Sequence, residues 1–197
     1  MPTPEPRGGS STNGGNSTNG VNVERLQETI HAVQENPELA QLQFRAETEW
    51  VDGARSRTRI ENIRQAGKEV DGDDRTLVLE GDEPDLLLGS DTAPNAVETV
   101  LHALTSCLAV GFAYNAAARG IEVRSLEFDL EGDLDLHPFL GLSREKRPGY
   151  QGIRVSYRVD SDASREEIED LCQYVQDTSP VMDILRNPVP VEVSLER

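Results

Sequence analysis

The chain has 197 residues, of which 36 are acidic and 19 basic, and its formal net charge at pH 7 is −17. This excess of negative charge argues against nucleic acid or an anionic membrane surface as a partner, because both would be repelled. No apolar run approaches the roughly 18 residues of a membrane span, and no signal-peptide pattern is present, so we expect a cytoplasmic protein with no membrane partner.

The basic residues are mostly of one kind, since only Lys68 and Lys146 are lysines and the others are arginines. An acidic, lysine-poor surface with few large aromatic residues is typical of proteins that work in a salt-rich cytoplasm. We therefore hypothesise that the chain comes from a salt-adapted organism. The two cysteines, in a reducing compartment, are more often free or redox-active thiols than a structural disulfide.

The N-terminal region divides into a tail and a helix. Residues 2–20 contain no large apolar side chain, so we expect residues 1–20 to be a disordered tail. Residues 21–40 predict an N-terminal helical extension, with Asn22 as its cap and Pro37 just beyond its end. The folded domain should then cover residues 41–197.

Three strands are predicted before the middle of the chain. Polar and apolar residues alternate from Leu42 to Val51, Asp52-Gly53 is a strong hairpin-turn signal, and residues 55–63 read as the returning strand. Alternation places Arg55, Arg57 and Arg59 on a single face of that strand. Residues 77–79 suggest a further short strand, after a charged turn at 71–74.

The longest apolar-periodic segment, residues 95–120, predicts a deeply placed helix. Asn95 and Glu98 have the spacing of a capping box, and Gly120 ends the helix. Cys107 falls at the edge of the apolar stripe, where a thiol is shielded from bulk water and reachable from one side.

The remainder of the chain predicts two strands, a helix and a last strand. Residues 123–136 and 153–159 alternate, with a long Pro- and Gly-containing connection at 137–149. Ser164 and Glu167 form a second capping box, which opens a helix that Pro180 breaks. Residues 189–195 should close the chain as a strand. The predicted order along the chain is strands, a long helix, strands, a second helix and a last strand. This order indicates an α+β fold with mostly antiparallel pairing.

With the cysteine-bearing helix in place, the sequence resembles the OsmC/Ohr family of thiol-dependent peroxidases over roughly residues 44–196. Three stretches carry the resemblance: LLLGSDTAPNAVETVLHALTSC up to the cysteine, AAARGIEV at the helix exit, and SPVMDILRNPVPVEVSLE near the C-terminus. The resemblance implies long central helices wrapped by antiparallel sheets in an intertwined homodimer, with active sites near the subunit interface.

The resemblance also implies the chemistry. Cys107 matches the cysteine that attacks an organic hydroperoxide, and an arginine and a glutamate tune it. Arg55, which follows the hairpin turn, stands where the family places its activating arginine, and Arg57 is the alternative. The family's second cysteine, directly before a proline, resolves the oxidised thiol.

Two positions depart from the family pattern. Ser179 stands before Pro180 where the family has its second cysteine, and Cys172 lies about 10 Å away along the helix axis. A Cys107–Cys172 disulfide would need α-carbons within about 7 Å, so it cannot be assumed, and core packing is favoured over a resolving role for Cys172. We therefore predict that an external thiol or dithiol reductant resolves Cys107.

Glu98 lies nine residues before Cys107, where the family carries its glutamate. Nine residues is half a turn out of phase and about 13 Å along a straight helix, so Glu98 could act only through the partner subunit, an intervening arginine or a bend. Its other interpretation is the helix cap.

Cys107 and the strand arginines also have purely structural interpretations. Cys107 could be a small hydrophobe packed in a helix core, and the strand arginines could form a solvated face. The rival function is a non-catalytic small-ligand-binding or structural dimer on the same scaffold. A thiol-dependent acyl transferase or hydrolase is disfavoured, because no histidine is placed to activate the cysteine.

We expect no metal and no cofactor. Neither His102 nor His137 has a second ligand at a spacing such as H-x-x-x-H, and no Walker, Rossmann or zinc pattern occurs. The leading hypothesis is a cytoplasmic, homodimeric OsmC-like peroxidase that reduces organic hydroperoxides through Cys107 in oxidative stress defence.

Overall fold

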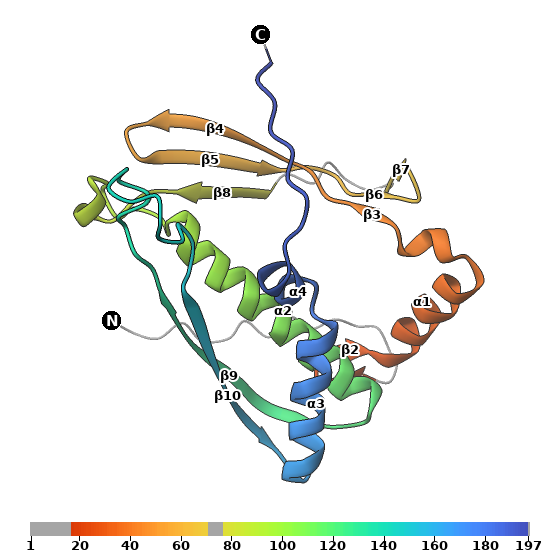
Figure 1. Ribbon diagram of the computed structural model, residues 1–197. Helices are drawn as coiled ribbons and strands as arrows, with labels where there is room; N and C mark the ends of the chain where they lie inside the picture. Colours follow the sequence, from red (N-terminus) through yellow and green to blue (C-terminus); the bar gives the residue numbers. More distant parts are fainter. Residues whose placement is uncertain (1–16, 71–76, 197) are drawn as a thin grey trace.

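The computed structural model describes residues 17–70 and 77–196 (Figure 1). The predicted charged turn at 71–74 and most of the predicted tail lie outside these residues. The helices are α1 (Val23–Glu35), η1 (Pro37–Ala40), η2 (Asp85–Leu87), α2 (Ala96–Ala118), α3 (Arg165–Thr178) and α4 (Pro180–Arg186). The strands are β1 (Ser17–Thr18), β2 (Val21–Asn22), β3 (Leu42–Gln43), β4 (Ala46–Asp52), β5 (Arg55–Ile60), β6 (Arg64–Gln65), β7 (Lys68–Glu69), β8 (Leu77–Gly81), β9 (Val123–Asp133) and β10 (Gly152–Ser161).

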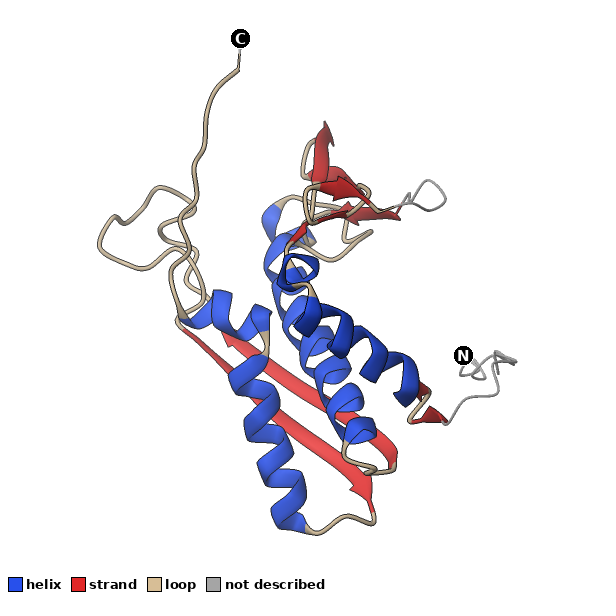
Figure 2. Ribbon diagram, turned by 90° about the vertical axis from the view of Figure 1, so that its right-hand side faces the viewer, coloured by secondary structure: helices blue, strands red, loops and turns tan. Residues whose placement is uncertain are grey.

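The core lies where α2 and α3 pack on one face of the long antiparallel hairpin of β9 and β10 (Figures 1 and 2). Leu108 and Phe112 of α2 and Leu171 of α3 are fully buried there. Alternate residues of the hairpin point at them, as the two-residue period of a strand requires. These strand residues are Leu126, Phe128, Leu130, Ile153, Val155, Tyr157 and Val159.

The central helix begins and ends where the sequence predicts. The Asn95 side chain accepts a hydrogen bond from the Glu98 N–H, and the Glu98 carboxylate accepts one from the Asn95 N–H, each at 2.9 Å. This reciprocal pair satisfies two of the donors that a helix start leaves free. Gly120 follows the end of the helix with a φ of +71°, a conformation that glycine adopts without strain.

A second sheet, ordered β4-β5-β8, lies across the start of α2 (Figure 1). Its register places Arg57 between Glu49 and Glu80, and Arg59 beside Glu47, so one face is a lattice of charges. The other face is mixed: Trp50 on it is 73% exposed, and Thr48 and Thr58 hydrogen-bond to each other beside it. The predicted hairpin and the single face for the arginines are both confirmed.

The prediction of disorder is wrong for residues 17–20. β1 and β2 form a hairpin around Asn19 and Gly20, whose positive φ values of 54° and 75° suit a two-residue turn. The Asn19 side chain then donates to the Ile121 carbonyl and accepts from the Val123 N–H, both at 2.9 Å. These two hydrogen bonds tie the short hairpin to the chain that enters β9, an interaction that the composition of the tail does not reveal.

The predicted strand at 189–195 is also wrong. These residues have no regular secondary structure, and Val193 and Leu195 are 92% and 89% exposed. Pro188 and Pro190 lack the N–H that a strand ladder needs, and no strand of the described chain pairs with the segment. Alternating apolar residues alone do not make a strand without a partner.

One expectation on membrane spans needs correction. The sequence has no unbroken apolar run of 18 residues. The helix α2 is nevertheless long enough and apolar enough on average to cross a membrane, because the few polar residues within it lower its mean hydropathy only slightly. Its apolar face instead packs against α3 and the β9–β10 hairpin. The mixed fold of helices and antiparallel sheets confirms the α+β class.

Candidate functional site

Cys107 lies half-buried in the middle of α2, and its sulfur faces the junction of α3 and α4. The Ser179 hydroxyl donates a hydrogen bond to the Cys107 Sγ at 3.2 Å. Ser179 is itself only 6% exposed. The contact joins residues 72 apart in sequence, so the packing of α4 against α2 holds the thiol and the hydroxyl together.

Ser179 has a structural role in addition to this contact. It is the N-cap of α4, where its Oγ accepts a hydrogen bond from the Met182 N–H at 3.2 Å, and Pro180 occupies the first helical position. Because the oxygen accepts from the backbone, its own proton is free to point at the Cys107 sulfur.

Cys172 lies on α3, where it lines a small cavity. Its neighbours there include Tyr157 and Ile168. Burial, and secondarily the nearby Glu169, raise the pKa of the Cys172 thiol, and burial raises the pKa of Tyr157 to about 12. Both cysteines are free thiols, and it is Ser179, not Cys172, that contacts the Cys107 sulfur.

The strand arginines form ion pairs on the surface of the second sheet. Arg57 Nε lies 2.8 Å from the Glu80 carboxylate, and Arg59 lies 2.9 Å from Glu47. Arg55 lies 3.7 Å from Asp52, on the hairpin that it follows. All three are about half exposed, and within the described part of a single chain none hydrogen-bonds to Cys107.

Glu98 is exposed at the start of α2, and the Asn95 N–H engages its carboxylate. Within one chain this geometry is that of the helix cap, as the half-turn offset from Cys107 requires. Among the described residues, no group of three or more His, Cys, Asp or Glu could hold a metal ion.

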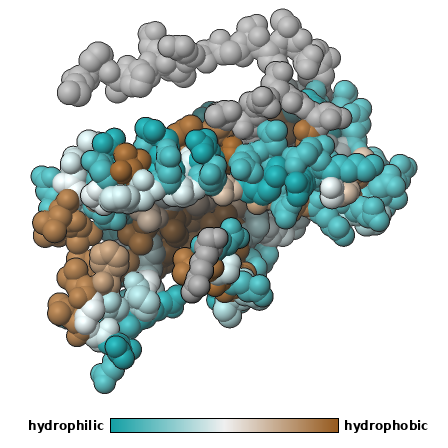
Figure 3. Space-filling view, turned by 90° about the horizontal axis from the view of Figure 1, so that it is seen from above, coloured by the Kyte–Doolittle hydropathy of each residue, from teal (hydrophilic) through white to brown (hydrophobic). Residues whose placement is uncertain are grey.

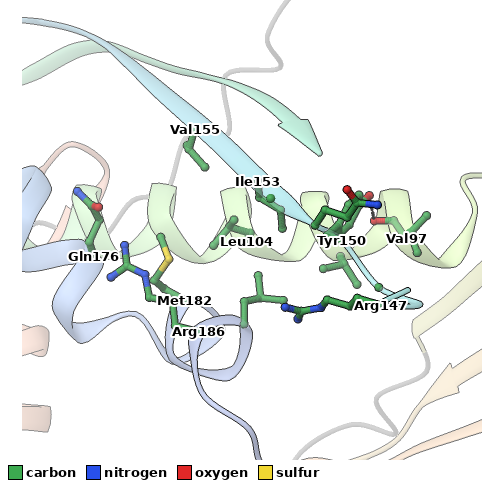
Figure 4. A pocket seen from close by; sticks show the side chains of 14 residues that line it. Val97, Leu104, Arg147, Tyr150, Ile153, Val155, Gln176, Met182 and Arg186 are labelled. Atoms are coloured by element: carbon green, nitrogen blue, oxygen red, sulfur yellow. Dashed lines mark hydrogen bonds between the residues drawn. The ribbon is translucent and has the colours of Figure 1, made fainter. Parts of the chain in front are cut away.

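A cavity of about 600 Å³ opens along α2 on the N-terminal side of Cys107 (Figure 4). Apolar side chains of α2, β10 and α4 line most of it, and Arg147 and Arg186 supply two guanidinium groups. Sequence reasoning missed both arginines, because Arg147 belongs to a long irregular connection and Arg186 to a short helix. The length and the Pro and Gly content of the connection at 137–149 were the available signal for Arg147. The apolar lining residues are Val97, Val100, Leu104, Ile153, Val155, Met182 and Leu185.

The family of the chain follows from comparison with known proteins. A family model described as OsmC-like protein matches residues 89–194, more than half of the chain. The chain belongs to the OsmC-like family. The matched region contains α2, the β9–β10 hairpin, α3 and α4, and therefore the Cys107–Ser179 contact.

Solved structures share this OsmC-like fold at low sequence identity. An OsmC-like protein from Mycoplasma pneumoniae is 14% identical with a TM-score of 0.56, and the match covers 74% of this chain and 89% of that one. An organic hydroperoxide resistance protein OsmC from Legionella pneumophila is 16% identical with a TM-score of 0.50, over 73% of this chain and 89% of that one. No curated protein sequence matches the chain.

Proposed function

We propose that this OsmC-like protein reduces organic hydroperoxides in the cytoplasm, with Cys107 as the nucleophile, in defence against oxidative stress. The observation that carries the proposal is the hydrogen bond from the buried Ser179 hydroxyl to the Cys107 sulfur at 3.2 Å. A structural cysteine packed as a small hydrophobe needs no such donor. The name of the Legionella relative, an organic hydroperoxide resistance protein, supports the same reaction.

The reaction begins with the Cys107 thiolate and the distal oxygen of the hydroperoxide. A sulfur–oxygen bond forms, the oxygen–oxygen bond breaks, and the leaving alkoxide takes a proton and departs as the alcohol. Cys107 is left as a sulfenic acid. The Ser179 hydroxyl donates to sulfur in the thiolate, where a charge-assisted hydrogen bond is stronger than one to a neutral thiol.

An external thiol completes the cycle in this proposal. The first reductant thiol displaces water from the sulfenic acid and forms a mixed disulfide, and a second thiol releases Cys107 and leaves the reductant as a disulfide. Ser179 cannot play this part because a hydroxyl does not form the disulfide. Cys172 remains the internal alternative, but its raised pKa keeps it protonated and poorly nucleophilic.

The proposed active form is a homodimer. Leu88, Val193 and Phe139 are each more than 70% exposed, and so is Trp50 on the second sheet. A hydrophobic hollow lies between the second sheet and the segment that follows α4 (Figure 3). Exposed apolar area on this scale is typical of an interface. A second copy would bring Arg55, or alternatively Arg57, and Glu98 toward the first copy's Cys107.

Peroxidase turnover tests the proposal directly. Wild type and Cys107→Ser are assayed with cumene hydroperoxide and a small dithiol, and the Cys107→Ser protein should have no activity above the uncatalysed rate. Cys172→Ser is the matched control and should retain the wild-type rate. Equal rates for wild type and Cys107→Ser would contradict the enzyme hypothesis and favour the non-catalytic small-ligand-binding or structural dimer.

Intact mass after one equivalent of hydroperoxide tests the resolution step. Wild type without reductant should gain the mass of one oxygen, about 16 Da, as the sulfenic acid. An internal Cys107–Cys172 disulfide, which loses two hydrogens instead, would show that the external thiol is not needed.

A further inference from the structure

The N-terminal helix α1 carries an apolar stripe that a single chain leaves open. Leu26, Ile30 and Val33 recur at steps of four and three residues and so share one side of the helix. None of the 13 residues of α1 is buried, and Ile30 is 46% exposed. A helix of this length is only marginally stable in water on its own, so the α1 stripe needs a surface to pack against.

Both ends of α1 are attached to the fold. Before the helix, the Asn19 side chain holds the β1–β2 hairpin to the Ile121 carbonyl and the Val123 N–H, where the chain enters β9. After the helix, the Gln65 side chain of β6 donates a hydrogen bond to the Leu39 carbonyl at 2.8 Å. The helix therefore bridges the C-terminal end of α2 and the sheet of β3, β6 and β7 (Figure 1). The α1 stripe is thus a fixed surface and not part of a loose end.

The central helix α2 also has an open side. Val110 and Tyr114, one turn apart, are 52% and 48% exposed. They lie on the side of α2 opposite to the fully buried Leu108 and Phe112. Cys107 precedes Tyr114 by two turns, so the thiol lies on the same side as Tyr114. Whatever covers the open side of α2 also closes over the surroundings of Cys107.

The exposed area of the chain is larger than that of a compact monomer. Its accessible surface is 15470 Å², whereas a compact protein of 21.7 kDa exposes about 9,200 Å². Allowing the residues outside the described ranges the full area of an unfolded chain still leaves an excess of about 3,500 Å². Obligate dimers bury an area of this size, about 2,000–5,000 Å² in total, and a small ligand covers far less. The excess therefore calls for a macromolecular partner.

A second copy of the chain meets these requirements. It presents the same stripe and the same open side of α2, and two-fold symmetry pairs such surfaces reciprocally within one interface. We propose that α1 is a clasp that packs its stripe of Leu26, Ile30 and Val33 on a second copy, in the interface that also covers the open side of α2. The inference rests on the homodimer of the proposed function. It adds to that dimer a segment that precedes residues 89–194, the region that the family model matches.

Sedimentation equilibrium of the full-length, reduced protein tests the clasp. It is done in molar KCl, because salt screens the repulsion between two copies that each carry a charge of −17. Wild type should be dimeric at low micromolar concentration. Ile30→Glu introduces a carboxylate into the stripe of each copy and should raise the dissociation constant about a hundredfold or more. Ile30→Ala removes only apolar area and should raise it about tenfold.

His31→Glu is the matched control. It adds the same charge at the next residue, which is exposed and points about 100° away around the helix, so the dissociation constant should stay unchanged. Hydrogen exchange of the α1 amides gives a second measurement. Protection of α1 in wild type should rise with protein concentration as dimers form, and Ile30→Glu should lose this rise. Thermal melts check folding, and Ile30→Ala decides the result if Ile30→Glu does not fold.

Three results would overturn the clasp. If wild type is dimeric and both Ile30 variants keep its dissociation constant, α1 lies outside the interface, and the homodimer and the peroxidase proposal still stand. If Ile30→Glu and His31→Glu weaken the dimer equally, the effect comes from charge and not from the stripe. A monomeric wild type would contradict both the clasp and the dimeric form of the proposed function, whereas turnover by wild type and Cys107→Ser tests the chemistry separately.

Discussion

The contact between Ser179 and Cys107 can be converted into a covalent test of the geometry. Changing Ser179→Cys places a second sulfur where the hydroxyl oxygen now lies, 3.2 Å from the Cys107 Sγ. The carbon–sulfur bond is longer than the carbon–oxygen bond, so the new sulfur extends further toward its partner. Oxidation of this variant by a hydroperoxide should therefore give a disulfide between Cys107 and the introduced cysteine within one chain, where wild type stops at the sulfenic acid.

The magnitude follows from the length of the loop that the bond closes. The two residues are 72 apart, and the chain-entropy relation for a loop of that size gives about 4 kcal/mol of stabilisation for the oxidised over the reduced variant. Ser179 also caps α4, and losing its oxygen should cost about 1 kcal/mol in both states. The oxidised variant should thus be about 3 kcal/mol more stable than wild type, and the reduced variant about 1 kcal/mol less stable.

Urea unfolding with and without a reductant measures both differences, and non-reducing mass spectrometry identifies the disulfide. Thr178→Cys is the matched control, because Thr178 is the exposed neighbour whose hydroxyl bonds to the Tyr174 carbonyl and not to Cys107. If the oxidised Ser179→Cys protein keeps two free thiols at these positions, the hydroxyl does not face the sulfur in solution and the reasoning is refuted.

Four further predictions concern stability. Phe112→Ala should lower the free energy of unfolding by about 3–5 kcal/mol, measured in urea, because Phe112 is fully buried between α2 and the β9–β10 hairpin. Glu98→Ala should cost about 1 kcal/mol through the capping box, and a peroxidase rate that also collapsed would favour a catalytic Glu98. Asp82 accepts hydrogen bonds from the side chain and backbone of Thr92, which lower its pKa to about 2. The ionised Asp82 should therefore contribute fully to the stability of the folded protein above about pH 4, and this contribution should be lost as the pH falls toward about 2. The Asp82→Asn variant should not show this loss in acid unfolding. With a net charge of −17, the thermal midpoint should rise between low and molar KCl as repulsion is screened, and a flat or falling midpoint would contradict the salt-adapted composition.

Local chemistry explains which elements were predictable from the sequence. α2 and α3 each begin at a capping box, and the hydrogen bonds of both boxes are present at 2.8–3.2 Å. The alternation of apolar and polar residues also predicted β9 and β10, because one face of each strand packs on the core. The segment at 189–195 has the same alternation but no partner in the described chain, and the hairpin at 17–22 has a partner without the alternation. Strand formation depends on pairing across the chain, which a periodic pattern alone does not reveal.

The candidate site shows the same limit at the level of side chains. Cys107 could be found because it belongs to the helix that organises the core, and Ser179 because it stands before Pro180 in the OsmC-like pattern. Arg147 could not be found, because its position depends on how a long connection folds back over α2. Arg55 was the better candidate in sequence, yet within one chain its partner is Asp52. The proposed source of a cation near the Cys107 thiol is therefore a second copy that delivers the β5 arginines. The peroxidase rate of Arg55→Gln, compared with that of the control Arg147→Gln, tests this: loss confined to Arg55→Gln identifies the dimer as the catalytic unit.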